Sequence, residues 1–417
     1  ESLKEDLGPL SGTEVTSVAS EGREALSSGM LSRSQKSQRA AILVHYFVSG
    51  ERVRVLVVST SGDAYRELDI TAKELNQRVA AFRQKLLDPK SNPRPEASAL
   101  YDSIIRPIAG ELRAVGLNDR KCHERKGASP GTLLVSLDGS LRYIPIGALF
   151  DQDCQEWLIE KVSIAVYASG GGGDLGVAPK SRWTVGAFGV SKATTIDGVA
   201  FPALTSVPDE LASIVRDPTR HTNGILPGTE FLDDQFTKEA FAHATEARYS
   251  VVHIATHLSF SPTEDTSFLV IGGGQKLSIA ELRKSGALDF RGVDLVTVSA
   301  CDSALDAGRR LDGREIESFA ALAQERGAKA VMASLWSVAD PSTAALMGKF
   351  YKLREEMHIP KVDALREVQR EFIRGGAKEK ELVGNDGATA ASKSPASGAD
   401  WSHPYYWAPF VVLGNWL

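Results

Sequence analysis

His257 and Cys301 are the residues of this chain best suited to covalent chemistry. Each closes a run rich in Val, Ile, Leu and Thr that predicts a buried strand, YSVVHIATH at 249–257 and DLVTVSAC at 294–301. In an open parallel sheet the carboxyl ends of the strands share an edge, and sites form there. An imidazole at that edge can take the proton of a thiol, and the thiolate can then attack a carbonyl carbon. A free Cys is most often an inert buried residue, so the prediction of a nucleophile depends on the two residues together.

A second histidine, His253, lies four residues before His257. A His-x-x-x-His pair on a helix can bind a metal ion. Here the segment is rich in Val and Ile and predicts a strand, and Ile254 follows the first His where a metalloprotease has Glu. We therefore interpret His253 as a core residue that supports the site, and we expect no metal and no other cofactor.

Several segments resemble a known family, the CHAT domain. They are HIATHLSFSPTEDTSFLVIGGG (253–274), LVTVSACDSA (295–304), DGREIESFAALAQERGAKAVMASLWSVADPST (312–343) and HPYYWAPFVVLGNW (403–416), with LYDSIIRPI (100–108) and LLVSLDGSLRYIPIGALFD (133–151) upstream. CHAT domains are caspase-like cysteine peptidases related to separase, caspases and gingipains, and they are often fused to TPR repeats. The resemblance implies that His257 is the base and Cys301 the nucleophile. It also implies that the backbone N–H groups of Leu258 and Cys301 bind the oxyanion. Many relatives have Gly after the catalytic His, and Leu258 departs from that pattern.

Asp340 lies in SLWSVADPST, which resembles the loop of separase-type enzymes where a carboxylate receives a basic P1 side chain. This implies cleavage after Arg or Lys. Asp340 also suits the N-cap of a helix that begins at Pro341, and the two roles are compatible. A preference for Asp at P1 would instead need arginines in the pocket, and that alternative stays open because three lie near Cys301: Arg309, Arg310 and Arg314.

The order of patterns along the chain predicts the architecture. Residues 1–38 are rich in Ser, Gly, Glu and Lys and predict a tail or linker. Strand and helix patterns then alternate through 39–180 and 181–417, which predicts a mainly parallel sheet flanked by helices. A glycine run at 169–174 marks the junction, and a polar, small-residue stretch predicts a mobile loop at 375–400. The resemblance implies two related caspase-like halves, a pseudo-protease half without a catalytic pair followed by an active half.

Composition limits the alternatives. The chain has 417 residues, 42% of them hydrophobic, and a net charge of only −5, which argues against a dominant nucleic-acid-binding face. No apolar run is long enough to span a membrane, and no signal peptide is evident. The three cysteines, an odd and sparse count, argue against a disulfide framework and favour a reducing, cytoplasmic location. Cys122 and Cys154 have no His-bearing strand motif beside them, so we do not expect either to be a nucleophile. The chain begins at Glu1 rather than Met, which fits the carboxyl-terminal part of a longer protein.

The function expected from these features is a cysteine endopeptidase that cleaves a protein partner through a thioester intermediate. We expect control by a regulatory or activating module, of the TPR type or another, and no direct binding of nucleic acid or membrane. Two alternatives remain. One is a module that keeps the fold and binds a peptide without cutting it. The other is a different hydrolase on a doubly wound sheet, which is disfavoured because no Gly-x-Ser-x-Gly elbow is present in the right context.

Overall fold

The computed structural model describes residues 20, 40–117, 122, 131–167, 180–220, 222–246, 249–259, 265–284, 289–299, 314–336, 338, 340–375 and 400–417. Three predicted features fall almost wholly outside these residues: the tail at 1–38, the glycine run at 169–174 and the loop at 375–400. Cys301 also lies outside them.

A twelve-stranded sheet runs through the molecule in the order β11-β12-β8-β13-β17-β18-β19-β7-β4-β1-β2-β3. Neighbouring strands are parallel except in three pairs, β18–β19, β1–β2 and β2–β3. Its strands in chain order are β1 (Ala41–Ser49), β2 (Arg52–Ser59), β3 (Gly62–Thr71), β4 (Thr132–Ser136), β7 (Ser163–Val166), β8 (Val185–Gly189), β11 (Val215–Arg216), β12 (Leu226–Leu232), β13 (Val251–Ala255), β17 (Leu295–Val298), β18 (Ala330–Ser334) and β19 (Phe410–Gly414).

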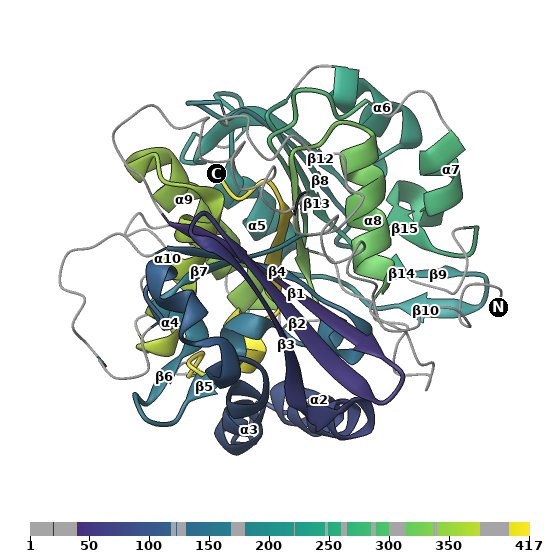
Figure 1. The fold of residues 1–417 in the computed structure, drawn as a ribbon. Helices are drawn as coiled ribbons and strands as arrows, with labels where there is room; N and C mark the ends of the chain where they lie inside the picture. Colours follow the sequence, from purple (N-terminus) through teal and green to yellow (C-terminus); the bar gives the residue numbers. More distant parts are fainter. Residues whose placement is uncertain are drawn as a thin grey trace.

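Helices cover both faces of this sheet. The α-helices are α2 (Ala72–Leu87), α3 (Arg94–Ile104), α4 (Leu158–Lys161), α5 (Val207–Ile214), α6 (Lys238–Glu246), α7 (Ile279–Lys284), α8 (Arg314–Glu325), α9 (Asp340–Met357), α10 (Lys361–Ile373) and α11 (Pro404–Trp407). In the carboxyl-terminal half, α5 and α9 pack together on one face, and α8 lies across the sheet from them (Figure 1). Because both faces are covered, central strands such as β13 are buried at every position and read as continuous apolar runs.

Short elements complete the fold. Three small sheets are formed by β5 (Phe150–Asp151) with β6 (Glu156–Trp157), by β9 (Thr194–Ile196) with β10 (Val199–Phe201), and by β14 (Leu258–Ser259), β15 (Phe268–Ile271) and β16 (Gln275–Ser278). The 3-10 helices are η1 (Arg106–Ile108), η2 (Glu111–Val115), η3 (Gly139–Tyr143), η4 (Ile146–Ala148), η5 (Asp233–Gln235) and η6 (Gly272–Gly274).

The start of helix α2 is fixed by its local sequence. The Thr71 hydroxyl accepts a hydrogen bond from the Glu74 N–H at 3.2 Å, and the Glu74 carboxylate accepts one from the Thr71 N–H at 3.0 Å. This reciprocal pair is a capping box. Helix α3 ends at Ile104 because Pro107 cannot continue an α-helix, and the chain goes on as η1 and η2. Gly116 then closes η2 in a left-handed conformation, φ +89°, that favours glycine.

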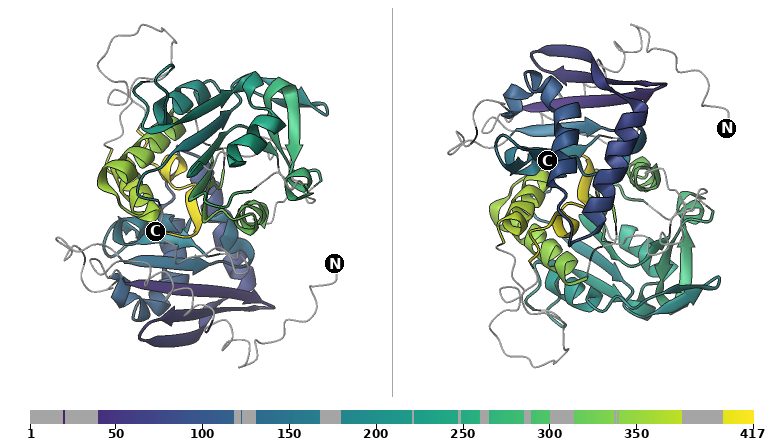
Figure 2. Two further views of the ribbon diagram at one scale, coloured as in Figure 1. Left: turned by 90° about the horizontal axis from the view of Figure 1, so that it is seen from above. Right: turned by 90° about the horizontal axis from the view of Figure 1, so that it is seen from below.

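The two halves of the chain meet at β19 and β7. Strand β19 is the last strand in the chain, yet it lies inside the sheet between β18 of the carboxyl-terminal half and β7 of the amino-terminal half. Figure 2 shows this yellow segment between the purple-blue and the teal-green parts of the molecule. Buried apolar side chains of both halves form one continuous core.

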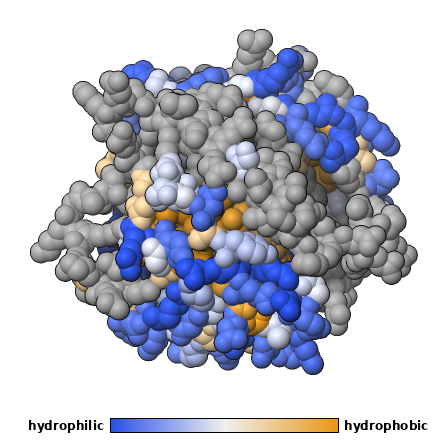
Figure 3. All heavy atoms as spheres, viewed as in Figure 1, coloured by the Kyte–Doolittle hydropathy of each residue, from blue (hydrophilic) through white to orange (hydrophobic). Residues whose placement is uncertain are grey.

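The described surface carries few large apolar side chains. Those that are exposed are Tyr65, Leu87, Val199 and Met357. On the face shown in Figure 3, hydrophobic surface gathers near the centre, beside atoms drawn in grey, and the lower part is mostly hydrophilic. Among the described helices, none is both long and apolar enough to cross a membrane.

Candidate active site

Strands β13 and β17 lead directly to the candidate site residues His257 and Cys301. They are parallel neighbours, with His253 matched to Thr297 and Ile254 matched to Val298. The ladder continues one step further, because the Ser299 N–H donates to the Ile254 carbonyl at 3.0 Å. The carboxyl ends of the two strands therefore lie side by side at one edge of the sheet, where sites form in folds of this type. Along the sequence, His257 and Cys301 each lie three residues beyond the matched pair Ile254 and Val298.

His257 lies in the short connection between β13 and β14, and its side chain is 4% exposed. Its Nε2 atom lies 2.7 Å from the carbonyl oxygen of Pro202. The ring of Phe201, at the end of β10, packs against the imidazole with ring centroids 5.4 Å apart. On the backbone, the His257 carbonyl accepts a hydrogen bond from the Val270 N–H at 2.9 Å. The segment of Phe201 and Pro202, which precedes α5, therefore contacts the imidazole ring, and β15 holds the His257 backbone.

The contact with Pro202 determines the tautomer of His257. A carbonyl oxygen can only accept a hydrogen bond, so Nε2 must carry the hydrogen. In the neutral ring the basic lone pair then lies on Nδ1. The geometry therefore assigns Nδ1 as the atom of His257 that can take a proton.

Leu258 follows His257 and begins β14. It pairs with Leu269 of β15, and the hydrogen bond that flanks this pair joins the Val270 N–H to the His257 carbonyl. In an antiparallel ladder this pattern makes Leu258 and Leu269 a non-hydrogen-bonded pair, whose N–H groups point away from the partner strand. The Leu258 N–H is therefore directed to the side of β14 opposite β15.

Two predicted site residues cannot be placed in the same way. Cys301 lies outside the described residues, as do Arg309 and Arg310. Asp340 is the first residue of α9, one residue before the expected helix start, and its side chain is not described. The preceding Trp336 is buried, and its indole N–H donates to the Tyr405 carbonyl at 3.1 Å. This bond ties the segment before α9 to α11.

His253 is a fully buried core residue, as the strand pattern predicts. Its Nε2 atom lies 3.0 Å from a Glu210 carboxylate oxygen, and its Nδ1 atom lies 3.1 Å from the Tyr351 hydroxyl. The Tyr351 hydroxyl is in turn 2.8 Å from the Thr297 hydroxyl. These residues belong to α5, β13, α9 and β17, so the network joins the two strands that lead to the site to two helices that cover them. Burial raises the pKa of Tyr351, and the nearby Glu210 charge adds to the shift.

The direction of each bond in this network follows from its acceptor. The Glu210 carboxylate can only accept, so His253 donates through Nε2 and its Nδ1 accepts from Tyr351 when the ring is neutral. The Tyr351 oxygen then accepts from Thr297. Every member has a partner, which is the condition under which buried polar groups are tolerated. Among the described residues, no three His, Cys, Asp or Glu side chains are grouped as metal ligands.

Sequence reasoning missed several of these residues. Pro202 acts through a backbone carbonyl, which leaves no trace in side-chain type. Glu210 and Tyr351 are 43 and 98 residues from His253 in the chain, so no local spacing joins them. One available signal was Glu210 itself, a charged residue on the apolar face of α5, where a buried partner is expected.

Cys122 and Cys154 form a disulfide across a separation of 32 residues. The expectation that the cysteine count argues against disulfides is therefore wrong for this pair. An odd total does not exclude one bridge, and a separation of 32 residues gave no local signal that these two cysteines would meet. Because two of the three cysteines are bonded to each other, the cysteine count no longer supports a reducing compartment.

The sequence profile of the CHAT domain matches residues 94–415. The chain belongs to the CHAT domain family. The match covers both strand ends described above and confirms the resemblance seen in the motifs. A search of curated proteins finds no match.

Solved structures of separase have the same fold. The 3.0 Å structure of the Saccharomyces cerevisiae separase–securin complex matches with a TM-score of 0.55 and 8% sequence identity, and the match covers 97% of this chain and 31% of that chain. The 2.6 Å structure of the same complex matches with a TM-score of 0.51 and 9% identity, covering 96% of this chain and 31% of that chain. The Arg-specific cysteine proteinase gingipain R matches with a TM-score of 0.40 and 10% identity, covering 82% of this chain and 74% of that chain. The expected fold class, a caspase-like, mainly parallel sheet flanked by helices, is confirmed. This CHAT chain spans about a third of the length of the separase chains it matches.

Proposed function

We propose that this CHAT protein is a cysteine endopeptidase in which His257 is the general base and Cys301 the nucleophile. The observation that carries the proposal is the hydrogen bond from His257 Nε2 to the Pro202 carbonyl. It fixes the tautomer with the lone pair on Nδ1 and anchors the ring at Nε2. A base held in this way, at the end of the strand next to the one that leads to Cys301, is what thiol activation needs.

The reaction would proceed in two stages. His257 Nδ1 takes the Cys301 proton, and the thiolate attacks the scissile carbonyl carbon to give a tetrahedral oxyanion. The oxyanion accepts hydrogen bonds from the N–H groups of Leu258 and Cys301. The orientation of the Leu258 N–H, away from β15, supports the first of these. The imidazolium then protonates the leaving amine, a thioester remains on Cys301, and water activated by His257 hydrolyses it.

A basic residue at P1 is the proposed specificity. Asp340 begins α9, so its carboxylate belongs to the segment that connects β18 to that helix. An Arg side chain would meet such a carboxylate through two parallel hydrogen bonds and a Lys side chain as a point charge. The competing Asp preference rests on Arg309, Arg310 and Arg314 in the segment after Cys301.

The substrate is proposed to be a protein, and control to come from a regulatory module of the TPR type or another kind. The separase structures contain securin as a partner of that protein, which supports control by an associated chain. The two halves are proposed to be a pseudo-protease half, 39–180, and a catalytic half, 181–417. A cytoplasmic location remains a proposal, and the Cys122–Cys154 disulfide weighs against it.

Labelling with peptidyl acyloxymethyl ketones tests the proposal. One probe carries Arg at P1 and one carries Asp, and intact mass is measured for the wild type and for Cys301→Ala. We expect one adduct from the Arg probe, absent in the variant. An adduct from the Asp probe alone would keep the nucleophile and overturn the role of Asp340.

The non-cleaving alternative gives a different pattern. A peptide-binding module would bind a substrate peptide with equal affinity before and after Cys301→Ala, and neither probe would label it. Labelling that persists in Cys301→Ala would place the reactive residue elsewhere and overturn the dyad.

A further inference from the structure

The two halves of the sheet join where β7 and β19 are neighbours, and this junction, the seam, has few matched strand positions. Strands β4 and β7 share four matched positions and β18 and β19 share five, whereas β7 and β19 share one, Leu413 with Val166. The two strands therefore meet at their carboxyl ends and diverge toward Ser163 and Phe410. Polar groups on the facing edges lose their ladder partners wherever the strands diverge.

Gln369 of α10 occupies part of this gap. Its amide nitrogen donates to the Trp407 carbonyl at 2.9 Å and to the Phe410 carbonyl at 3.2 Å. The Phe410 carbonyl faces the seam, because the neighbouring bond from the Leu335 N–H to the Pro409 carbonyl makes Phe410 and Ser334 a non-hydrogen-bonded pair. Since both partners of the amide nitrogen are carbonyls, the orientation of the amide is fixed.

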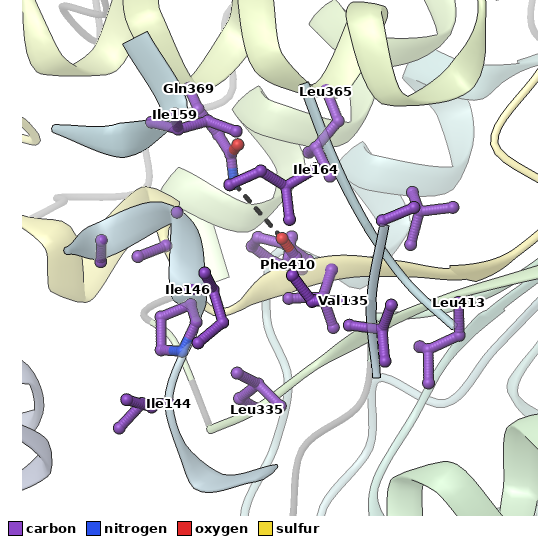
Figure 4. Close-up of a pocket in the computed structure, with 18 of the residues that line it drawn as sticks. Val135, Ile144, Ile146, Ile159, Ile164, Leu335, Leu365, Gln369, Phe410 and Leu413 are labelled. Carbon is purple, nitrogen blue, oxygen red and sulfur yellow. Dashed lines mark hydrogen bonds between the residues drawn. The ribbon is translucent and has the colours of Figure 1, made fainter. Parts of the chain in front are cut away.

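The same gap holds a pocket of about 50 Å³. Its walls come from both halves and are mostly aliphatic, including Val135, Ile146, Ile164, Leu365 and Leu413 (Figure 4). The remaining wall residues include two aromatic and two polar ones: Trp407, Phe410, Gln369 and Arg142. The small volume and the branched aliphatic walls suit a narrow hydrocarbon chain better than a ring.

One polar atom of the residues that line this pocket has no hydrogen-bond partner within the described part of the chain. Gln369 is 4% exposed, and its Oε1 atom has no hydrogen-bond partner among the described residues. A buried acceptor left in this way is costly and is relieved by a donor that enters the cavity. Figure 4 shows Gln369 at one side of the pocket with its amide nitrogen turned to Phe410.

We propose that the seam pocket binds a small aliphatic molecule that ends in a single hydrogen-bond donor. The chain lies among the aliphatic walls, and the donor, a hydroxyl or an N–H, bonds to Gln369 Oε1. Because the walls belong to both halves, the bound ligand stabilises their docking. The pocket also reaches Leu335 at the end of β18, on the segment that leads to Trp336 and α9. The proposal does not depend on peptidase activity.

Binding of propan-1-ol to the full chain tests the proposal, with ethyl methyl ether as a control that has the same number of heavy atoms and no donor, because a pocket of about 50 Å³ has room for roughly four heavy atoms. Binding is followed by ligand-observed NMR and by the shift of the unfolding temperature. We expect saturable binding of the alcohol, a rise in unfolding temperature, and affinity about tenfold weaker for the ether, the usual effect of one lost hydrogen bond.

Two variants fill the pocket from opposite halves, Ala165→Leu in β7 and Ala408→Leu next to α11. Each should abolish binding of the alcohol, and the variant that keeps a cooperative unfolding transition decides the test if the other fails to fold. Absence of saturable binding to the wild type would overturn the proposal. Unchanged binding in a folded filled variant would do the same, and equal affinity for alcohol and ether would overturn the role of Gln369.

Discussion

The buried network around His253 makes a strong prediction about stability. Glu210 is 3% exposed, and one of its carboxylate oxygens lies 3.0 Å from His253 Nε2 inside the core. Removing His253 leaves the buried Glu210 carboxylate without its hydrogen-bond donor, and an uncompensated buried carboxylate typically costs about 3–5 kcal/mol. We therefore expect His253→Leu to lower the free energy of unfolding by about that amount.

Removing both members should cost much less. Replacing both partners of a buried hydrogen bond by apolar side chains of similar shape is often close to neutral. Tyr351 keeps its bond to Thr297, so the hydroxyl is not left without a partner. We expect His253→Leu with Glu210→Met to be only about 1–2 kcal/mol less stable than the wild type, and thus more stable than His253→Leu alone.

Urea unfolding at pH 7, followed by circular dichroism, measures all four corners of the double-mutant cycle. Glu210→Met alone leaves the His253 N–H unsatisfied and should cost about 1–3 kcal/mol. The sum of the two single-variant losses in unfolding free energy should therefore exceed the loss in the double variant by several kcal/mol. If the two single costs add to within about 0.5 kcal/mol of the double cost, the residues are not coupled and the reasoning is refuted.

Three further predictions concern separate parts of the chain. Burial lowers the pKa of Lys361 to about 7, so between pH 7 and 10 the unfolded chain binds more protons than the native one and stability rises with pH. From pH 7 to pH 9 this gain is about 2 kcal/mol, and Lys361→Met should remove it from urea titrations while Lys352→Met, at an exposed position, should not. Cys122→Ser opens a loop of 32 residues and should lower the free energy of unfolding by about 3–4 kcal/mol. A reducing agent should destabilise the wild type by the same amount and should leave the stability of the variant unchanged. Gly228→Ala places a methyl group 1.9 Å from the Val185 carbonyl and should lower the midpoint of thermal unfolding, whereas Gly110→Ala, where the space is open, should have little effect.

Local signals predicted much of the fold. The capping box at Thr71, the break at Pro107 and the glycine at 116 each act within a few residues, so the sequence alone contains the physical reason for them. The buried strands β13 and β17 are continuous apolar runs with no competing helical period. Their parallel packing then places the carboxyl ends of both strands at one edge.

Other features depend on contacts between distant segments and carry no local signal. Strand β3 is an edge strand and is exposed at most positions, so it lacks the alternation that marks a half-buried strand. The disulfide and the Pro202 carbonyl depend on which loops meet in space. The three-stranded sheet of β14, β15 and β16 is built from strands of two to four residues, which are too short for a period to show.

The position of β19 has a consequence for the order of events during synthesis. A ribosome releases the amino-terminal segments first, and domains fold as they emerge. Strand β7 is available about 250 residues before its neighbour β19, so the seam can close only after residues 410–414 have left the ribosome. The contacts that join the halves are therefore among the most distant in the chain, and they are expected to form late. If the proposed active site forms only after this closure, the proposed peptidase activity would begin only after the whole sheet has been synthesised.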